Sequence, residues 1–194
     1  MVQSLNQRAL HLVKASESEF ERLGINSFEV EGGGRVIDCG VKALGGPAAG
    51  MFAARLTMAD LGSPRLETDE LKCAAEVGAA DLLQVRVETE SPLLACMASQ
   101  YAGWRVSVGD FSGMGSGPVR LALGREELFT ELDLGKETTD CAVGFLETSS
   151  IPGPEVFEWI SNELGLDKTN IVLAVARTGS PSGTIQVVSR SVET

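Results

Sequence analysis

Histidine is nearly absent from this sequence, since His11 is the only one among 194 residues. A metal centre built on several histidines is therefore excluded by count. A catalytic triad with a histidine base would depend on this one side chain, which falls on an expected N-terminal helix with no partner nearby in the sequence. Hydrolytic chemistry must instead use carboxylates, arginines, backbone donors or an already activated substrate.

Positive charge is also scarce, with 16 Lys and Arg against 27 Asp and Glu, for a net charge of −11. This balance argues against nucleic acid and anionic membranes as partners. A small anionic ligand is not excluded, because a local pair of arginines can reverse the field inside one cleft.

Cysteine pairs and long apolar runs are missing too. Four cysteines lie far apart, and the absence of a Cys-x-x-Cys motif argues against a zinc knuckle. The N-terminus lacks an apolar h-region, and no stretch approaches the roughly 18 apolar residues of a membrane span. We therefore expect buried thiols in a protein of the reducing cytoplasm, without a membrane partner.

Apolar patterning predicts strands and helices interspersed along the whole chain, which indicates an α/β fold, or α+β with layered sheets. The N-terminal helix is expected over 4–23 and a hairpin over 26–41. Further helices are expected at 48–62, 92–100, from Pro118 onward and at 154–164 with Gly165 as its stop. Further strands are expected at 82–88, from Trp104, at 137–148, 171–176 and 182–189, with the last two side by side.

The stretch FSGMGSGPVR, residues 111–120, is the most distinctive motif. Its glycines Gly113, Gly115 and Gly117 predict a strand-to-helix loop whose backbone N–H groups can approach a ligand, at a helix N-terminus that favours an anion. It lacks the GxGxxG spacing of dinucleotide sites and the GK[ST] of a phosphate-binding loop. A tight turn without ligand is the alternative.

Two further features are compatible with a binding site. In SQYAGW, residues 99–104, the Trp104 indole could stack on a flat heterocycle or could belong to the core. Arg190 and Glu193 follow an apolar run, where α/β folds place ligands if that run is a strand. A surface ion pair is the other interpretation of their spacing.

Several segments together resemble methenyltetrahydromethanopterin cyclohydrolase, in the same order and at similar spacing. They are VIDCGV from Val36, MASQYAGW from Met97, SGMGSGPVRLAL from Ser112, FLETSSIP from Phe145 and GTIQVVSRSVET from Gly183. The resemblance covers essentially the whole chain. The sequence departs from the family pattern at ARTGSPSGT, residues 176–184, where Arg177 and Pro181 replace a more alanine-rich run.

The resemblance implies that Arg190 and Glu193 are catalytic and that a pterin is the substrate, with no separate cofactor. It makes Gln100, Trp104, Gly113, Gly115, Ser116 and Gly117 candidates for the pterin or tail pocket. Residues 1–194 would form the first α/β domain of a two-domain enzyme and the start of the second, with little turnover alone. The resemblance also implies a homo-oligomer, namely a trimer, in cytoplasmic one-carbon metabolism (methanogenesis or formaldehyde oxidation). A non-catalytic pterin-binding or assembly module is the alternative.

Overall fold

The computed structural model describes residues 4–69 and 82–191. Its centre is a six-stranded sheet in the order β1-β2-β8-β7-β6-β5. Strands β2 (Arg35–Gly40), β8 (Ile171–Ala176) and β7 (Ala142–Glu147) are parallel. The flanking strands β1 (Asn26–Glu29), β6 (Phe111–Ser116) and β5 (Trp104–Val108) pair antiparallel with their neighbours. The α/β class predicted from the sequence is confirmed.

Strand β8 is buried on both faces, as its continuous apolar sequence predicts. Val172, Ala174 and Ala176 contribute to a core with helices α1 (Leu5–Ser16), α2 (Phe20–Leu23) and α3 (Pro47–Thr57). Ile171, Leu173 and Val175 contribute to a second core with α4 (Val119–Leu123) and α6 (Pro154–Leu164). Helices therefore cover both faces of the sheet.

The remaining helical elements are short, except for two that border the site described below. They are η1 (Glu17–Glu19), α5 (Glu127–Glu131) and η3 (Lys168–Asn170). The two exceptions are the π-helix η2 (Leu93–Gln100) and α7 (Pro181–Arg190). None of the helices in the described ranges is long and apolar enough to cross a membrane.

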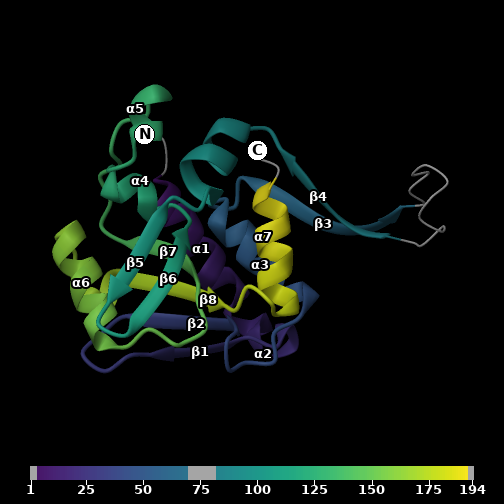
Figure 1. Ribbon diagram of the computed structural model, residues 1–194, viewed down its shortest axis with the longest axis horizontal. Coiled ribbons are helices and arrows are strands. Elements are labelled where there is room, and N and C mark those ends of the chain that lie inside the picture. Colours follow the sequence, from purple (N-terminus) through teal and green to yellow (C-terminus); the bar gives the residue numbers. More distant parts are fainter. Residues whose placement is uncertain (1–3, 70–81, 192–194) are drawn as a thin grey trace.

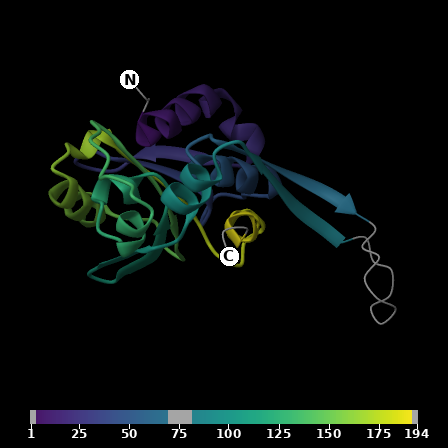
Figure 2. The same ribbon diagram turned by 90° about the horizontal axis from the view of Figure 1, so that it is seen from above.

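A two-stranded ribbon projects from the body of the molecule (Figures 1 and 2). Its strands β3 (Gly62–Asp69) and β4 (Leu82–Thr89) pair antiparallel along their whole length. The sequence predicted β4 but did not predict β3.

The predicted final strand at 182–189 is wrong, because these residues form helix α7. The Ser180 hydroxyl caps this helix by accepting from the Gly183 N–H at 3.1 Å, and Pro181 occupies its first turn. Helix α7 packs on α3 so closely that a Cβ at Gly50 would lie 2.7 Å from the Ser182 carbonyl oxygen. Capping and packing together overcome the strand preference of the β-branched residues.

The predicted glycine loop at 112–118 is also wrong over most of its length. Residues 112–116 lie in strand β6, and only Gly117 and Pro118 turn the chain into α4. The Gly117 φ of 100° explains the glycine at the turn itself. The strand expected at 137–148 is confirmed only from Ala142 onward.

Candidate active site

The carboxyl ends of the three parallel strands meet at one edge of the sheet, where open α/β folds bind ligands. Strand β7 ends at Glu147, and β8 leads through Arg177 to the start of α7. Beside them, the buried Asp38 carboxylate near the end of β2 accepts backbone N–H groups from Gly40 to Ala43 at 2.7–3.0 Å. These bonds fix the loop at this edge, because the carboxylate satisfies four consecutive backbone donors.

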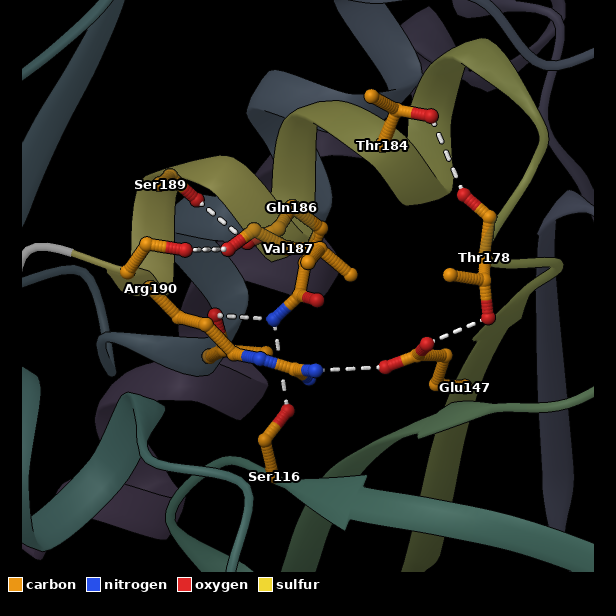
Figure 3. Close-up of polar contacts among 10 residues, drawn as sticks. Ser116, Glu147, Thr178, Thr184, Gln186, Val187, Ser189 and Arg190 are labelled. Carbon is orange, nitrogen blue, oxygen red and sulfur yellow. Dashed lines mark hydrogen bonds and ion pairs between the residues drawn. The ribbon is translucent and has the colours of Figure 1, made fainter.

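Glu147 and Arg190 form the central ion pair of this edge (Figure 3). Arg190 Nη2 lies 2.7 Å from Glu147 Oε2, and the two side chains are only 14% and 13% exposed. Thr178, in the loop after β8, donates its hydroxyl to the other carboxylate oxygen of Glu147. Both oxygens of the carboxylate are thereby engaged, so the position of the Arg190 guanidinium is defined from the sheet side.

A second group of buried polar side chains lies beside this ion pair along α7 (Figure 3). Gln186 Nε2 approaches the Ser116 hydroxyl at 3.4 Å, and Gln100 Nε2 donates to the Ser189 hydroxyl at 3.2 Å. Both glutamines are fully buried. Neither glutamine Oε1 atom, nor Arg190 Nη1, has a hydrogen-bond partner among the described residues. Unpaired buried polar atoms are costly, so their concentration beside one ion pair marks a site for a ligand or ordered water.

The π-helix η2 places Gln100 in this network. Its last turn contains an i→i−5 bond, from the Tyr101 N–H to the Cys96 carbonyl at 2.9 Å. Arg120 of α4, itself fully buried, donates to the Met97 and Ser99 carbonyls at 3.3 Å each and is held by Glu126. π-Helical turns are frequent at functional sites, and the hydrogen bonds from the buried Arg120 hold this one in place.

Among the residues singled out in the sequence, Gln100 and Ser116 belong to this network, which joins them through Ser189 and Gln186. Arg190, the residue after Ser189, lies beside the network and pairs with Glu147. Two more lie at its border. Gly113 of β6 lines a groove together with Glu147. Gly117 donates its N–H to the Ser99 carbonyl at 2.7 Å and so joins the turn before α4 to η2.

The structure does not bring Trp104 or Gly115 to this network. Trp104 of β5 pairs with Gly115 of β6, and Gly115 pairs with Leu146 of β7. Residues paired across strands lie on the same face, so all three are on the face of the sheet that α6 covers. The Trp104 ring stacks on Trp159 with centroids 6.3 Å apart. Gly115 provides room for Trp104, because a Cβ there would lie 2.8 Å from the Trp104 carbonyl oxygen. The glycine therefore serves packing in this structure and does not expose backbone to the groove.

Arg190 was expected at the end of a strand with Glu193 as its partner. The structure places Arg190 at the end of helix α7 and pairs it with Glu147, while Glu193 lies outside the described residues.

Sequence reasoning missed Glu147 and Gln186. A signal for Glu147 was present, since it is the first charged residue after the apolar run of β7. Gln186 gave no comparable signal, because its role depends on the helical phase of α7.

A metal centre is not evident in the part of the chain that the structure describes. No group of three or more His, Cys, Asp or Glu side chains there is arranged to hold a metal ion.

Comparison with known proteins gives one consistent result. The family described as "Cyclohydrolase (MCH)" matches residues 4–194. The chain is 38% identical to the methenyltetrahydromethanopterin cyclohydrolase of Methanosarcina mazei and 39% identical to that of Methanosarcina barkeri, over 98% of this chain in both cases. It is 43% identical to the enzyme of the same name from Rhodopirellula baltica, over 84% of this chain and 47% of that relative. The chain spans 58% of the length of the two Methanosarcina relatives. It belongs to the cyclohydrolase (MCH) family.

Proposed function

We propose that this protein hydrolyses the methenyl bridge of 5,10-methenyltetrahydromethanopterin to give the 5-formyl product. The family match across residues 4–194 carries this proposal, since the relatives are named for that reaction. The same match favours an enzyme over a non-catalytic binding or assembly module.

The chemistry asks for few catalytic groups. The bridging carbon, held between N5 and N10, is part of an amidinium-like cation and is already electrophilic. The reaction needs a water to be deprotonated as it attacks this carbon, and a proton to be delivered to N10 as the C–N10 bond breaks. The hydroxyl proton of the adduct leaves to solvent as the formyl C=O bond forms. A carboxylate can deprotonate the water and then protonate N10, and the cationic substrate favours its ionised form. We assign this role to Glu193.

Arg190 acts as a positioned donor in this proposal. Its Nη2 is held by Glu147 at 2.7 Å, while its buried Nη1 has no partner among the described residues. Nη1 is thus the atom that can bind the Glu193 carboxylate or the oxygen of the tetrahedral adduct. Glu147 neutralises the arginine, which reduces its repulsion of the cationic carbon.

Gln100 and Ser116 contribute to the floor of the pterin pocket in this proposal, and Gly113 borders it. Trp104 supports the floor from the opposite face of the sheet. The substrate itself carries the one-carbon unit, so no further cofactor is proposed.

The cellular setting follows from the same family assignment. We propose a homotrimer of the cytoplasm, acting in the one-carbon steps of methanogenesis or formaldehyde oxidation. Cys39 and Cys141 are buried free thiols, which suits a reducing compartment.

The test measures how fast the absorbance of the methenyl-pterin falls, after subtraction of the rate of spontaneous hydrolysis. The protein used is extended to the full length of its relatives. We expect Glu193→Gln to lower kcat by about 10²–10⁴-fold with KM within a few-fold, because the amide keeps the shape and loses the base. Arg190→Leu should be similarly severe. Arg190→Lys should recover only part of the loss, because lysine restores the positive charge but not the planar pair of N–H donors.

The matched control is Glu158→Gln on α6, which removes a surface ion pair with Lys168 and should leave kcat unchanged. Near-wild-type turnover in Glu193→Gln would sink the catalytic assignment. No hydrolysis by the unmodified protein would sink the proposed reaction itself.

A further inference from the structure

A groove of about 580 Å³ opens beside the Glu147–Arg190 pair. Its walls come from β5, β6 and the loops that follow β7 and β8, so it lies along the same edge of the sheet. Glu147 lines the groove together with the hydroxyl-bearing residues Ser112, Thr148, Ser149 and Thr178. A ligand at the ion pair could therefore extend into it without leaving the site.

Two arginines line this groove, Arg105 of β5 and Arg177 after β8. Both are exposed, and neither guanidinium has an ion pair or hydrogen bond to any residue in the ranges 4–69 and 82–191. The other arginines behave differently. Arg8 donates to the Ala59 and Asp60 carbonyls, and the rest pair with carboxylates: Arg22, Arg35, Arg55, Arg65, Arg86, Arg120, Arg125 and Arg190.

This distribution is unexpected in a chain with a net charge of −11. Acids outnumber bases, so an arginine whose guanidinium has neither an ion pair nor a hydrogen bond should be uncommon, and the two such arginines of the described ranges share one cavity. Glu147 is the one acid of the groove lining, and Arg190 already balances its charge. The groove therefore carries a local excess of positive charge inside an acidic molecule.

The surrounding backbone adds to this field. Helix α7 begins at Pro181, a few residues after Arg177, and its N-terminus contributes partial positive charge on the same side. Guanidinium groups also match the geometry of phosphate and carboxylate oxygens through paired N–H donors.

We propose that this groove is an oxyanion subsite, in which Arg105 and Arg177 bind a phosphate or carboxylate group of the substrate. The subsite would hold the anionic part of the molecule whose reacting carbon lies at Arg190. The assignment to the substrate rests on the proposed function, whereas the anion-binding property of the groove does not.

The first experiment titrates inorganic phosphate into the protein in a buffer of low ionic strength that contains no other oxyanion. Binding is followed by amide chemical shifts, with the largest changes expected at Ser149, Thr178 and Gly179. The double substitution Arg105→Gln with Arg177→Gln should weaken the apparent affinity at least 10-fold, because it removes both charges while retaining polar side chains. The matched control is Arg65→Gln on the projecting ribbon, where affinity should not change. No shifts in the unsubstituted protein, or equal affinity in the double variant, would overturn the subsite.

The second experiment tests whether the anion that binds in the groove is a group of the substrate. Inorganic phosphate should inhibit methenyl-pterin hydrolysis competitively, and the double variant should raise KM at least 10-fold with kcat nearly unchanged. Inhibition that is not competitive would overturn the assignment to the substrate. If no hydrolysis can be measured at all, the proposed function fails, while the phosphate titration still decides whether the groove binds an oxyanion.

Discussion

Leu146 and Glu147 are neighbours on β7, yet they face opposite sides of the sheet and have different surroundings. Leu146 is fully buried against Trp104 and the apolar side chains of α6. Glu147 faces α7 and binds Arg190 and Thr178. One face of the sheet edge is thus filled by close apolar packing, and the other by polar side chains whose hydrogen-bonding capacity is only partly used.

This difference separates two physical tasks. The α6 face supplies burial of apolar surface, which stabilises the sheet in a non-directional way. The α7 face holds buried amide and guanidinium atoms without partners at Gln100, Gln186 and Arg190. Such groups lower stability unless something binds them, which is the usual pattern of a functional site. The apolar face therefore supports a polar face that is not optimised for stability.

The strongest test of the comparison is Gly115→Val, on the apolar face. The new side chain would meet the Trp104 backbone and ring, so we expect a loss of about 3 kcal/mol or more in the free energy of unfolding. A glycine that brought backbone to a ligand would give a larger effect on ligand binding than on stability, whereas the contact of Gly115 with Trp104 predicts the reverse. Urea denaturation measures the change.

Gly135→Val is the matched control, since nothing lies within 4 Å of the added Cβ there. Equal stability of the two variants would show that Trp104 moves aside easily and that the face is less closely packed than described.

A smaller effect is expected from comparing Leu146→Ala with Glu147→Gln. Leu146→Ala should cost about 2–4 kcal/mol by leaving a cavity. Glu147→Gln should cost roughly 1 kcal/mol, because the amide oxygen still accepts from Arg190 while the charge is lost. Hydrolysis should show the opposite order, with kcat reduced more by Glu147→Gln. If both variants lose stability and turnover in the same proportion, the two faces do not have separate tasks.

A further effect, confined to alkaline pH, concerns Cys39, which lies in the apolar core beneath the polar face. Burial, and next the charge of Asp38, raise the pKa of its thiol far above the ordinary value. A raised pKa favours the neutral thiol in the native state, so this contribution to stability is complete below the unfolded pKa near ~8.5 and declines as pH rises beyond it. We expect a loss of about 2 kcal/mol between pH 8 and pH 10 that Cys39→Ala abolishes.

The measurement is the free energy of unfolding as a function of pH in both proteins. The slopes are compared rather than the absolute values, since alanine also removes packing. Parallel curves would mean that the Cys39 thiol ionises as easily in the native state as in the unfolded chain.

Local signals gave correct elements wherever they agreed with one another. The helix Pro154–Leu164 begins with proline and ends at Gly165, which adopts the left-handed conformation at φ 68°. The strand Ile171–Ala176 is buried on both faces, as its unbroken apolar run predicted. Residues 182–189 show the opposite case, because β-branched residues favoured a strand while Ser180 and Pro181 formed a helix start. The helix expected at 92–100 also follows a Ser-Pro pair, Ser91 and Pro92, and the structure has the π-helix Leu93–Gln100 there.

The sequence by itself determined the α/β class, most element positions and the acidic balance, and it singled out Arg190 as a candidate site residue. These properties depend on composition and on patterns that repeat within a few residues. Only the tertiary structure decided that Arg190 binds Glu147, that Trp104 and Gly115 pack on the opposite face, and that Arg105 and Arg177 share a groove. Each of these relations joins residues far apart in the chain, and each depends on strand register and helical phase. A shift of one residue in a strand turns its side chains to the other face, so the site is defined only once the sheet and α7 have packed.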